Sequence, residues 1–183
     1  MVVEAAEVNT TTRRHPIESV TLNDGSRVTL RPIRPEDEAA LTAFYERLSP
    51  ESAYQRFFAL MARLPPNWAR FLANVDYEKR MAIVAVDPDE RLIAVARYEY
   101  DEKSKDAELA IVVEDRWQGK RLGTIMMTEL LRYAEDHGIH RFRAYVLADN
   151  HRMLDIFTRV TRVLERHTKQ GVTSLLLAHK LEG

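Results

Sequence analysis

One stretch near the middle of the chain, Ala107–Tyr133, constrains the fold more than any other. Residues 108–113 are mostly apolar on both alternating faces, which predicts a central β-strand. From Leu122 onward, apolar side chains recur at helical spacing, which predicts an amphipathic helix. The connection between the two contains Gly119 and Gly123. The stretch therefore predicts a buried strand, a glycine-bearing turn and a helix in direct succession.

This connection has the properties of an anion site. A helix N-terminus presents unpaired N–H groups and the positive end of its dipole, and glycines let phosphate oxygens approach the backbone. Two familiar phosphate loops are excluded, because Glu114 and Arg121 stand where a P-loop needs Gly and Ser or Thr, and GxGxxG is absent. Any strand-to-helix connection favours glycine, so the turn alone leaves a purely structural role equally open.

The residues around the turn resemble the GNAT superfamily of acyl-CoA-dependent N-acyltransferases. The family signature is Gln/Arg-x-x-Gly-x-Gly/Ala, which Gln118, Leu122 and Gly123 match in frame. Arg121 departs from it, because it stands where the first motif glycine usually is. A positive φ there would cost arginine on the order of 1 kcal/mol or more, whereas a right-handed helical conformation would let Arg121 face a phosphate. We expect the second.

Length and composition indicate an ordinary globular protein. The 183 residues suffice for one domain with a substantial core, and 45% are hydrophobic and 30% charged. A formal net charge of −1 offers nucleic acid no attractive field, and no apolar run is long enough to span a bilayer. No signal peptide is visible, and the lack of cysteine excludes an acyl-cysteine intermediate and a thiolate metal site. We therefore expect a cytoplasmic protein without nucleic-acid or membrane partners.

The order of predicted elements extends the resemblance over nearly the whole chain. Residues 1–15 are polar and aperiodic, which predicts a disordered tail before a single domain at 16–183. Within that domain the patterns predict the order ββααα-βββ-α-β-α-ββ, which is the GNAT order. The resemblance implies an α/β (α+β) fold. Its sheet is mixed, mostly antiparallel and twisted, with about seven strands flanked by helices and splayed at the CoA site.

Several segments resemble one branch more closely, the catalytic domain of bacterial Pat-type protein lysine acetyltransferases. These segments are Arg31–Asp37, Ser52–Phe58, Val75–Tyr77, Ala107–Ala110 and Val146–Asn150 with Met153. Pat-type enzymes often carry a fused regulatory domain, and we expect none within these 183 residues.

The resemblance implies acetyl-CoA as cosubstrate and assigns residues to it. The strand would stabilise the thioester carbonyl and pair with the pantetheine arm, and the turn would take the pyrophosphate. Asn150 matches the family's CoA-contacting asparagine, although by itself it is equally a helix cap. The implied cofactor-binding residues are Ile111, Val112, Val113, Gln118, Gly119, Lys120, Arg121, Leu122, Gly123, Thr124, Asn150 and Met153.

The transfer itself needs a general base, because a lysine with a pKa of about 10.4 is almost entirely protonated near pH 7. Glu108 occupies the family's catalytic glutamate position, and the alternative is an edge carboxylate paired with a cation. Many GNAT enzymes protonate the leaving thiolate with a tyrosine where this chain has Phe157. Asp76 and Tyr77 would give the acceptor side acidic and aromatic character, though each is equally explained as structural.

The resulting hypothesis is direct acetyl transfer to an amine, with a protein lysine, such as one on an acyl-CoA synthetase, as the acceptor. The alternatives are a small-molecule amine acetyltransferase and a non-catalytic acyl-CoA-binding sensor, the latter suggested by Arg121 and Phe157. We predict no metal, because the histidines are scattered and His137 with His140 is typical of a surface pair.

Overall fold

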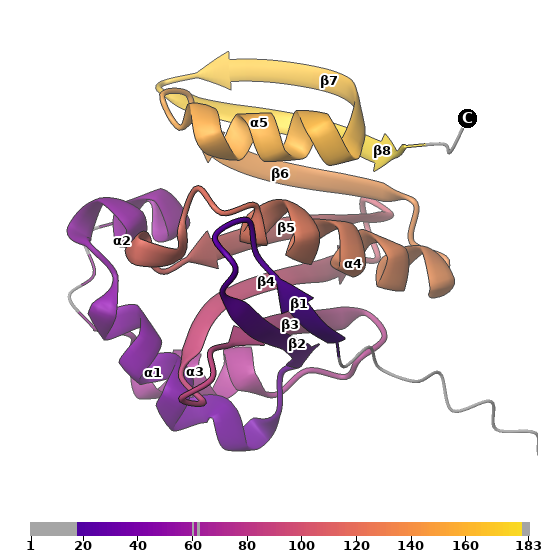
Figure 1. Ribbon diagram of the computed structural model, residues 1–183. Helices are drawn as coiled ribbons and strands as arrows, with labels where there is room; N and C mark the ends of the chain where they lie inside the picture. Colours follow the sequence, from indigo (N-terminus) through magenta and orange to yellow (C-terminus); the bar gives the residue numbers. More distant parts are fainter. Residues whose placement is uncertain (1–17, 60, 62, 181–183) are drawn as a thin grey trace, which may run out of the picture.

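The computed structural model describes residues 18–59, 61 and 63–180 (Figure 1). Its strands form one sheet with the order β1-β2-β3-β4-β5-β6-β8-β7, so the expected GNAT fold is confirmed with eight strands rather than about seven. The expected tail at residues 1–15 lies outside the described residues. In chain order the elements are β1 (Glu18–Thr21), β2 (Arg27–Pro32), the 3-10 turn η1 (Pro35–Asp37), α1 (Glu38–Arg47), α2 (Pro50–Phe57), α3 (Pro66–Ala73), β3 (Arg80–Val86), β4 (Leu92–Asp101), β5 (Asp106–Val113), η2 (Asp115–Trp117), α4 (Leu122–Asp136), β6 (Arg141–Leu147), α5 (His151–Val160), β7 (Thr161–Lys169) and β8 (Val172–His179).

The central feature of the sheet is the junction between β5 and β6. Every other neighbouring pair is antiparallel, whereas β5 and β6 run parallel. Their pairing begins at Ala107 with Phe142 and ends at Leu109 with Ala144. Beyond that point the two strands diverge, while β5 stays paired with β4 as far as Val113. The expected splay is therefore present at the carboxyl-terminal half of β5.

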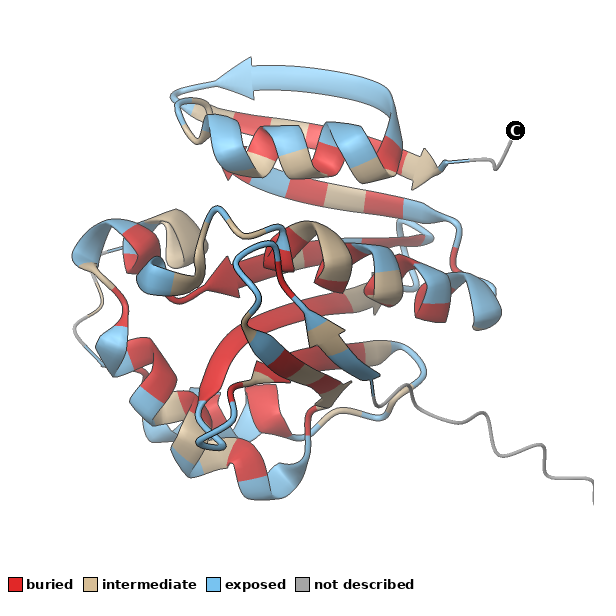
Figure 2. Ribbon diagram, viewed as in Figure 1, coloured by how far each residue is buried: buried red, intermediate tan, exposed pale blue. Residues whose placement is uncertain are grey.

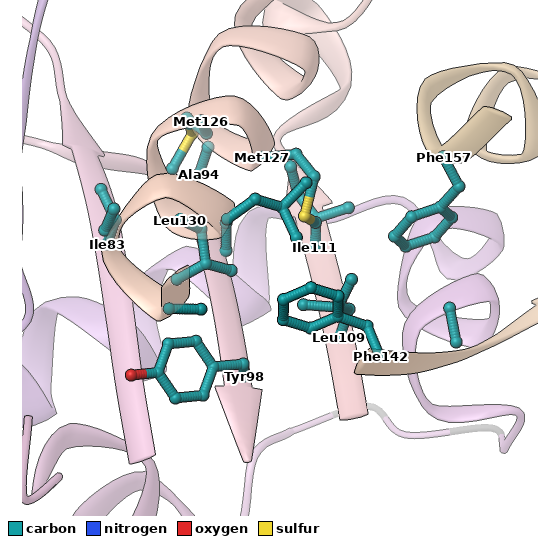
Figure 3. Packing of buried hydrophobic residues seen from close by; sticks show 14 of the residues in the cluster. Ile83, Ala94, Tyr98, Leu109, Ile111, Met126, Met127, Leu130, Phe142 and Phe157 are labelled. Atoms are coloured by element: carbon teal, nitrogen blue, oxygen red, sulfur yellow. The ribbon is translucent and has the colours of Figure 1, made fainter. Parts of the chain in front are cut away.

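The sheet separates two apolar clusters. On one face, α4 and α5 pack against the strands, and Figure 3 shows Met126, Met127 and Leu130 of α4 lying over β3, β4 and β5. On the other face, α1, α2 and α3 cover β3 to β5 through a second cluster that includes Phe44 and Val95. Because both faces of β3, β4 and β5 are covered, these strands are buried along most of their length (Figure 2). No helix among the described residues combines the length and apolar character that crossing a membrane requires.

Local side chains fix the ends of the helices that border the splay. The Ser49 hydroxyl accepts from the Ser52 N–H at 3.1 Å and caps α2. The Asn150 amide oxygen accepts from the Met153 N–H at 3.2 Å and caps α5. At the other end of α5 the chain enters β7 directly at Thr161, whose hydroxyl donates to a carbonyl of the last helical turn.

Candidate active site

The free edge of β5 supplies the backbone groups of the site. The Glu114 N–H donates to the Ile93 carbonyl on β4 at 2.9 Å, and peptide groups along a strand alternate between its two edges. Ile111 and Val113 therefore direct their N–H and C=O groups into the splay. Val112 directs its peptide groups to β4 instead. Among the three strand residues that the resemblance assigns to the cofactor, only Ile111 and Val113 present backbone groups to the open side.

Two adjoining cavities occupy the splay. The first lies between β5, β6 and α2, and its lining includes Glu108, the diverging part of β5, Tyr145 and Phe157. The second lies between the N-terminal turn of α4 and α5, and its lining includes residues 121–124. Gln118, Asn150 and Met153 line both. The strand edge, the turn and the start of α5 thus form one continuous channel.

Glu108 stands at the mouth of the first cavity. Its residue is exposed, and within the described part of the chain its carboxylate has no ion pair or hydrogen bond. Partial burial raises the pKa of Glu108 above its ordinary value, Arg56 opposes this rise, and Glu99 and Asp106 add to it. The alternative of an edge carboxylate paired with a cation therefore has no support in the geometry. A carboxylate with a raised pKa and no fixed partner is suited to proton transfer.

The turn before α4 presents backbone donors. No side chain caps this helix, and its first intrahelical bond runs from the Ile125 N–H to the Arg121 carbonyl. The N–H groups of residues 122–124 precede that bond and point out of the helix end. An anion in the second cavity would receive these donors and the positive end of the α4 dipole.

The conformation that we expect for Arg121 is wrong. Its φ is 69° and its ψ is 5°, which is left-handed rather than right-handed helical. A Cβ in that region costs about 1 kcal/mol, which explains why a glycine is usual at this point of the signature. The side chain nevertheless lines the second cavity, so the strained residue also places a cation beside it.

Arg121→Gly is expected to raise the free energy of unfolding by about 0.5–1 kcal/mol, because it removes the strain of the left-handed residue. Denaturant unfolding measures the change. The matched control is Arg132→Gly within α4, which should lower the free energy of unfolding by about 1 kcal/mol. An equal decrease in the free energy of unfolding for the two variants would show that position 121 carries no strain.

The second cavity also contains two cations that the sequence did not reveal as site residues. Arg152 and Arg159 lie two turns apart on α5, and both line the cavity. Arg159 lies 3.2 Å from the Asp155 carboxylate, and Arg152 donates to the Gln118 side chain at 2.6 Å. Their seven-residue spacing in the sequence indicates that they share one face of the helix. The prediction for this segment rested on its apolar positions, so the two arginines were not identified as site residues.

Gln118 and Gly123 are held by neighbouring protein groups. The Gln118 amide donates to the Ser52 hydroxyl at 3.1 Å and to the Val113 carbonyl at 2.9 Å, besides accepting from Arg152. This residue therefore ties α2, β5 and α5 together around the channel. A Cβ on Gly123 would lie 3.0 Å from the Ile156 side chain, so glycine allows the close approach of α4 and α5.

Three predicted site residues lie away from the two cavities. Lys120 forms an ion pair with Asp24 at 2.7 Å in the turn between β1 and β2. Asp76 accepts from the Glu78 and Arg80 N–H groups at 2.9 and 2.8 Å, which shapes the loop before β3. The Tyr77 hydroxyl donates to the backbone of the segment after β2 at 2.7 Å. The structural explanation of Asp76 and Tyr77 therefore fits their contacts, and neither lines the channel.

The histidine pair shows no metal-binding geometry. His137 stacks on Tyr133 and its Nδ1 lies 2.8 Å from the Tyr133 carbonyl oxygen. Within the described ranges, no group of three or more His, Cys, Asp or Glu residues is arranged to hold a metal ion.

Comparisons with known proteins agree with this geometry. The family model of the acetyltransferase (GNAT) domain matches residues 27–160. A curated acetyltransferase of Pseudomonas aeruginosa is 31% identical over 145 residues, which cover 78% of this chain and 77% of the relative. Acetyltransferase Pat of Mycolicibacterium smegmatis is 34% identical over 154 residues, which cover 80% of this chain but only 44% of that protein. The crystal structure of the GNAT domain of S. lividans PAT superposes with a TM-score of 0.82 at 29% identity, covering 90% of this chain and 99% of that domain.

Proposed function

Because the chain belongs to the GNAT family of acetyltransferases, we propose that it transfers the acetyl group of acetyl-CoA directly to the ε-amine of a protein lysine. The observation that carries the proposal is the splay, in which the free peptide groups of Ile111 line the same cavity as the unpaired carboxylate of Glu108. The relatives named Pat support a lysine acceptor.

In this proposal acetyl-CoA lies along the channel. The pyrophosphate binds the N–H groups at the start of α4 with Arg121, Arg152 and Arg159 around it. The pantetheine arm pairs with the free edge of β5 as an additional strand would. The thioester carbonyl then reaches the Ile111 N–H, which stabilises the negative charge that the oxygen gains in the transition state.

Glu108 prepares the amine for attack. It accepts a proton from the lysine ammonium, either directly or through one water, and the neutral nitrogen attacks the thioester carbon. The C–N bond forms while the carbonyl electrons move to oxygen. When the intermediate collapses, the C–S bond breaks, the thiolate leaves with its electron pair, and the nitrogen loses its second proton to solvent as the amide forms.

The leaving thiolate needs no acid from the protein. Phe157 lines the first cavity at the position where many GNAT enzymes have tyrosine, and a phenyl ring has no proton to give. A thiol with a pKa of about 8.5 is a good leaving group near neutral pH. Phe157 is buried and packs in the main core cluster, so its role here is to shape the cavity wall.

Glu99→Gln is expected to shift the acidic limb of the kcat/KM profile to lower pH. Glu99 and Glu108 are directly paired across β4 and β5, and the charge of Glu99 contributes to the raised pKa of Glu108. Removing that charge lowers the Glu108 pKa, so the base stays ionised at more acidic pH. An acidic limb at the same pH in the wild type and in Glu99→Gln would show that the two carboxylates do not interact.

Release of CoA thiol from acetyl-CoA tests the proposed function. The acceptors are purified acyl-CoA synthetases and, separately, polyamines, amino acids and aminoglycosides, with mass spectrometry to locate the modified lysine. Fast release with a protein and one mapped lysine is the expected result. Release with small amines alone would keep the chemistry but identify a small-molecule acetyltransferase.

A further inference from the structure

The strands β6, β8 and β7 have one face that no described helix covers. Their other face packs against α4 and α5 through buried residues such as Phe142 and Leu177. The cluster beneath α1, α2 and α3 takes none of its described members from these three strands. Strand pairing places twelve side chains on the uncovered face in four rows, which are Arg141, Ala178 and Arg162; Arg143, Leu176 and Glu165; Tyr145, Ser174 and His167; and Leu147, Val172 and Lys169. We call these twelve residues the open face.

The open face is accessible to a partner. Figure 2 shows β7 exposed along nearly its whole length. On β6, Arg141 is exposed and Tyr145 retains 43% of its surface. The Leu176 side chain at the centre is 7% exposed and belongs to neither core cluster.

The open face is continuous with the position of Glu108. Glu108 and Arg143 are direct partners on β5 and β6, so their side chains project from the same side of the sheet. Tyr145 of the open face and Glu108 both line the first cavity. A protein chain that inserts a lysine toward Glu108 therefore lies over β6, β8 and β7, because α1 to α3 cover the neighbouring half of this side.

The charges of the open face are unbalanced. Within the described residues, Arg141, Arg162 and Lys169 are exposed and have no ion-pair partner. Arg143 is already neutralised by Asp106 at 3.2 Å. The one acid in the four rows, Glu165, lies 3.7 Å from His167. The surplus is therefore positive, although the chain as a whole carries a net charge of −1.

We propose that the open face binds an acidic segment that flanks the acceptor lysine. This inference rests on the proposed function and specifies its substrate class. Strands are about 4.8 Å apart and rise about 3.3 Å per residue, which puts Arg141 about 8 Å from Glu108 and Arg162 about 16 Å away. An extended acceptor therefore reaches these cations with aspartate or glutamate two to five positions from the lysine.

The test compares lysine peptides with the wild type and charge variants. The peptides carry two glutamates, two glutamines or two lysines within five positions of an otherwise constant acceptor lysine. We expect kcat/KM to be at least ten times higher for the glutamate peptide than for the lysine-flanked peptide, mainly through KM. Arg141→Glu with Arg162→Glu should remove this preference, while kcat/KM for the glutamine peptide changes less than threefold.

Arg166→Glu is the matched control, because Arg166 is exposed on the same strand but projects from the opposite face of the sheet. It should leave the preference unchanged. Equal rates with all three peptides, or equal effects of the control and the double variant, would overturn the docking proposal alone. If no lysine peptide is acetylated while a small amine is, both the docking proposal and the lysine acceptor are overturned.

Discussion

Glu108→Gln is expected to lower kcat/KM for a lysine acceptor by about 100-fold or more near neutral pH. The amide cannot accept the ammonium proton, so only the rare neutral amine remains competent to attack. The dissociation constant of acetyl-CoA should stay within about twofold, because Glu108 does not line the second cavity, at the start of α4, where the pyrophosphate binds in this proposal. Thiol release and calorimetric titration with acetyl-CoA in the absence of an acceptor measure the two quantities.

The pH dependence gives this prediction a second readout. Glu108 acts only when ionised, and because its pKa is raised, activity is lost as pH falls through a value above the ordinary 4.3 or so of glutamate. In Glu108→Gln that limb should disappear, leaving a low rate that follows the ionisation of the free amine. Glu102→Gln is the control, since Glu102 is an exposed acid in the loop between β4 and β5 and pairs with Lys79. Unchanged turnover in Glu108→Gln would remove Glu108 from the mechanism.

The parts of the site that follow from local sequence could be predicted. The strand–turn–helix succession rests on apolar periodicity, and α4 begins at Leu122 as the pattern predicts. The α2 cap at Ser49 also depends on residues within one turn. The splay was an expectation from the family resemblance, because strand periodicity does not encode where two strands that are distant in sequence separate.

The remaining features of the site depend on contacts between segments that are distant in the sequence or on the geometry of a particular loop. Arg152 and Arg159 become site residues only because α5 packs beside the N-terminus of α4. Asp76 was expected at the acceptor side, but the N–H groups of its own loop occupy its carboxylate. The Arg121 conformation is a further case, since the turn geometry overrides the preference of arginine for negative φ. Residue type alone identified neither the cations that line the second cavity nor the carboxylate that its own loop occupies.

Thr124→Glu is expected to weaken acetyl-CoA binding by about 10- to 100-fold, because it puts a negative charge among the N–H groups that receive the pyrophosphate. Thr124 is the third residue of α4, where glutamate favours both the helix dipole and the capping of the first turn. The free energy of unfolding should therefore stay constant or rise. Binding and stability are expected to change in opposite directions, which a damaged fold would not produce.

Thr128→Glu is the matched control for this test. Thr128 lies one turn further along α4, is exposed, and donates its hydroxyl to the Thr124 carbonyl at 2.8 Å, but it does not line the second cavity. The control adds the same charge to the same helix, so its effect on acetyl-CoA affinity should be less than threefold. Raising the salt concentration should recover part of the lost affinity in Thr124→Glu, since screening weakens the repulsion. Equal affinities of the two variants would show that the phosphates bind elsewhere than at the start of α4.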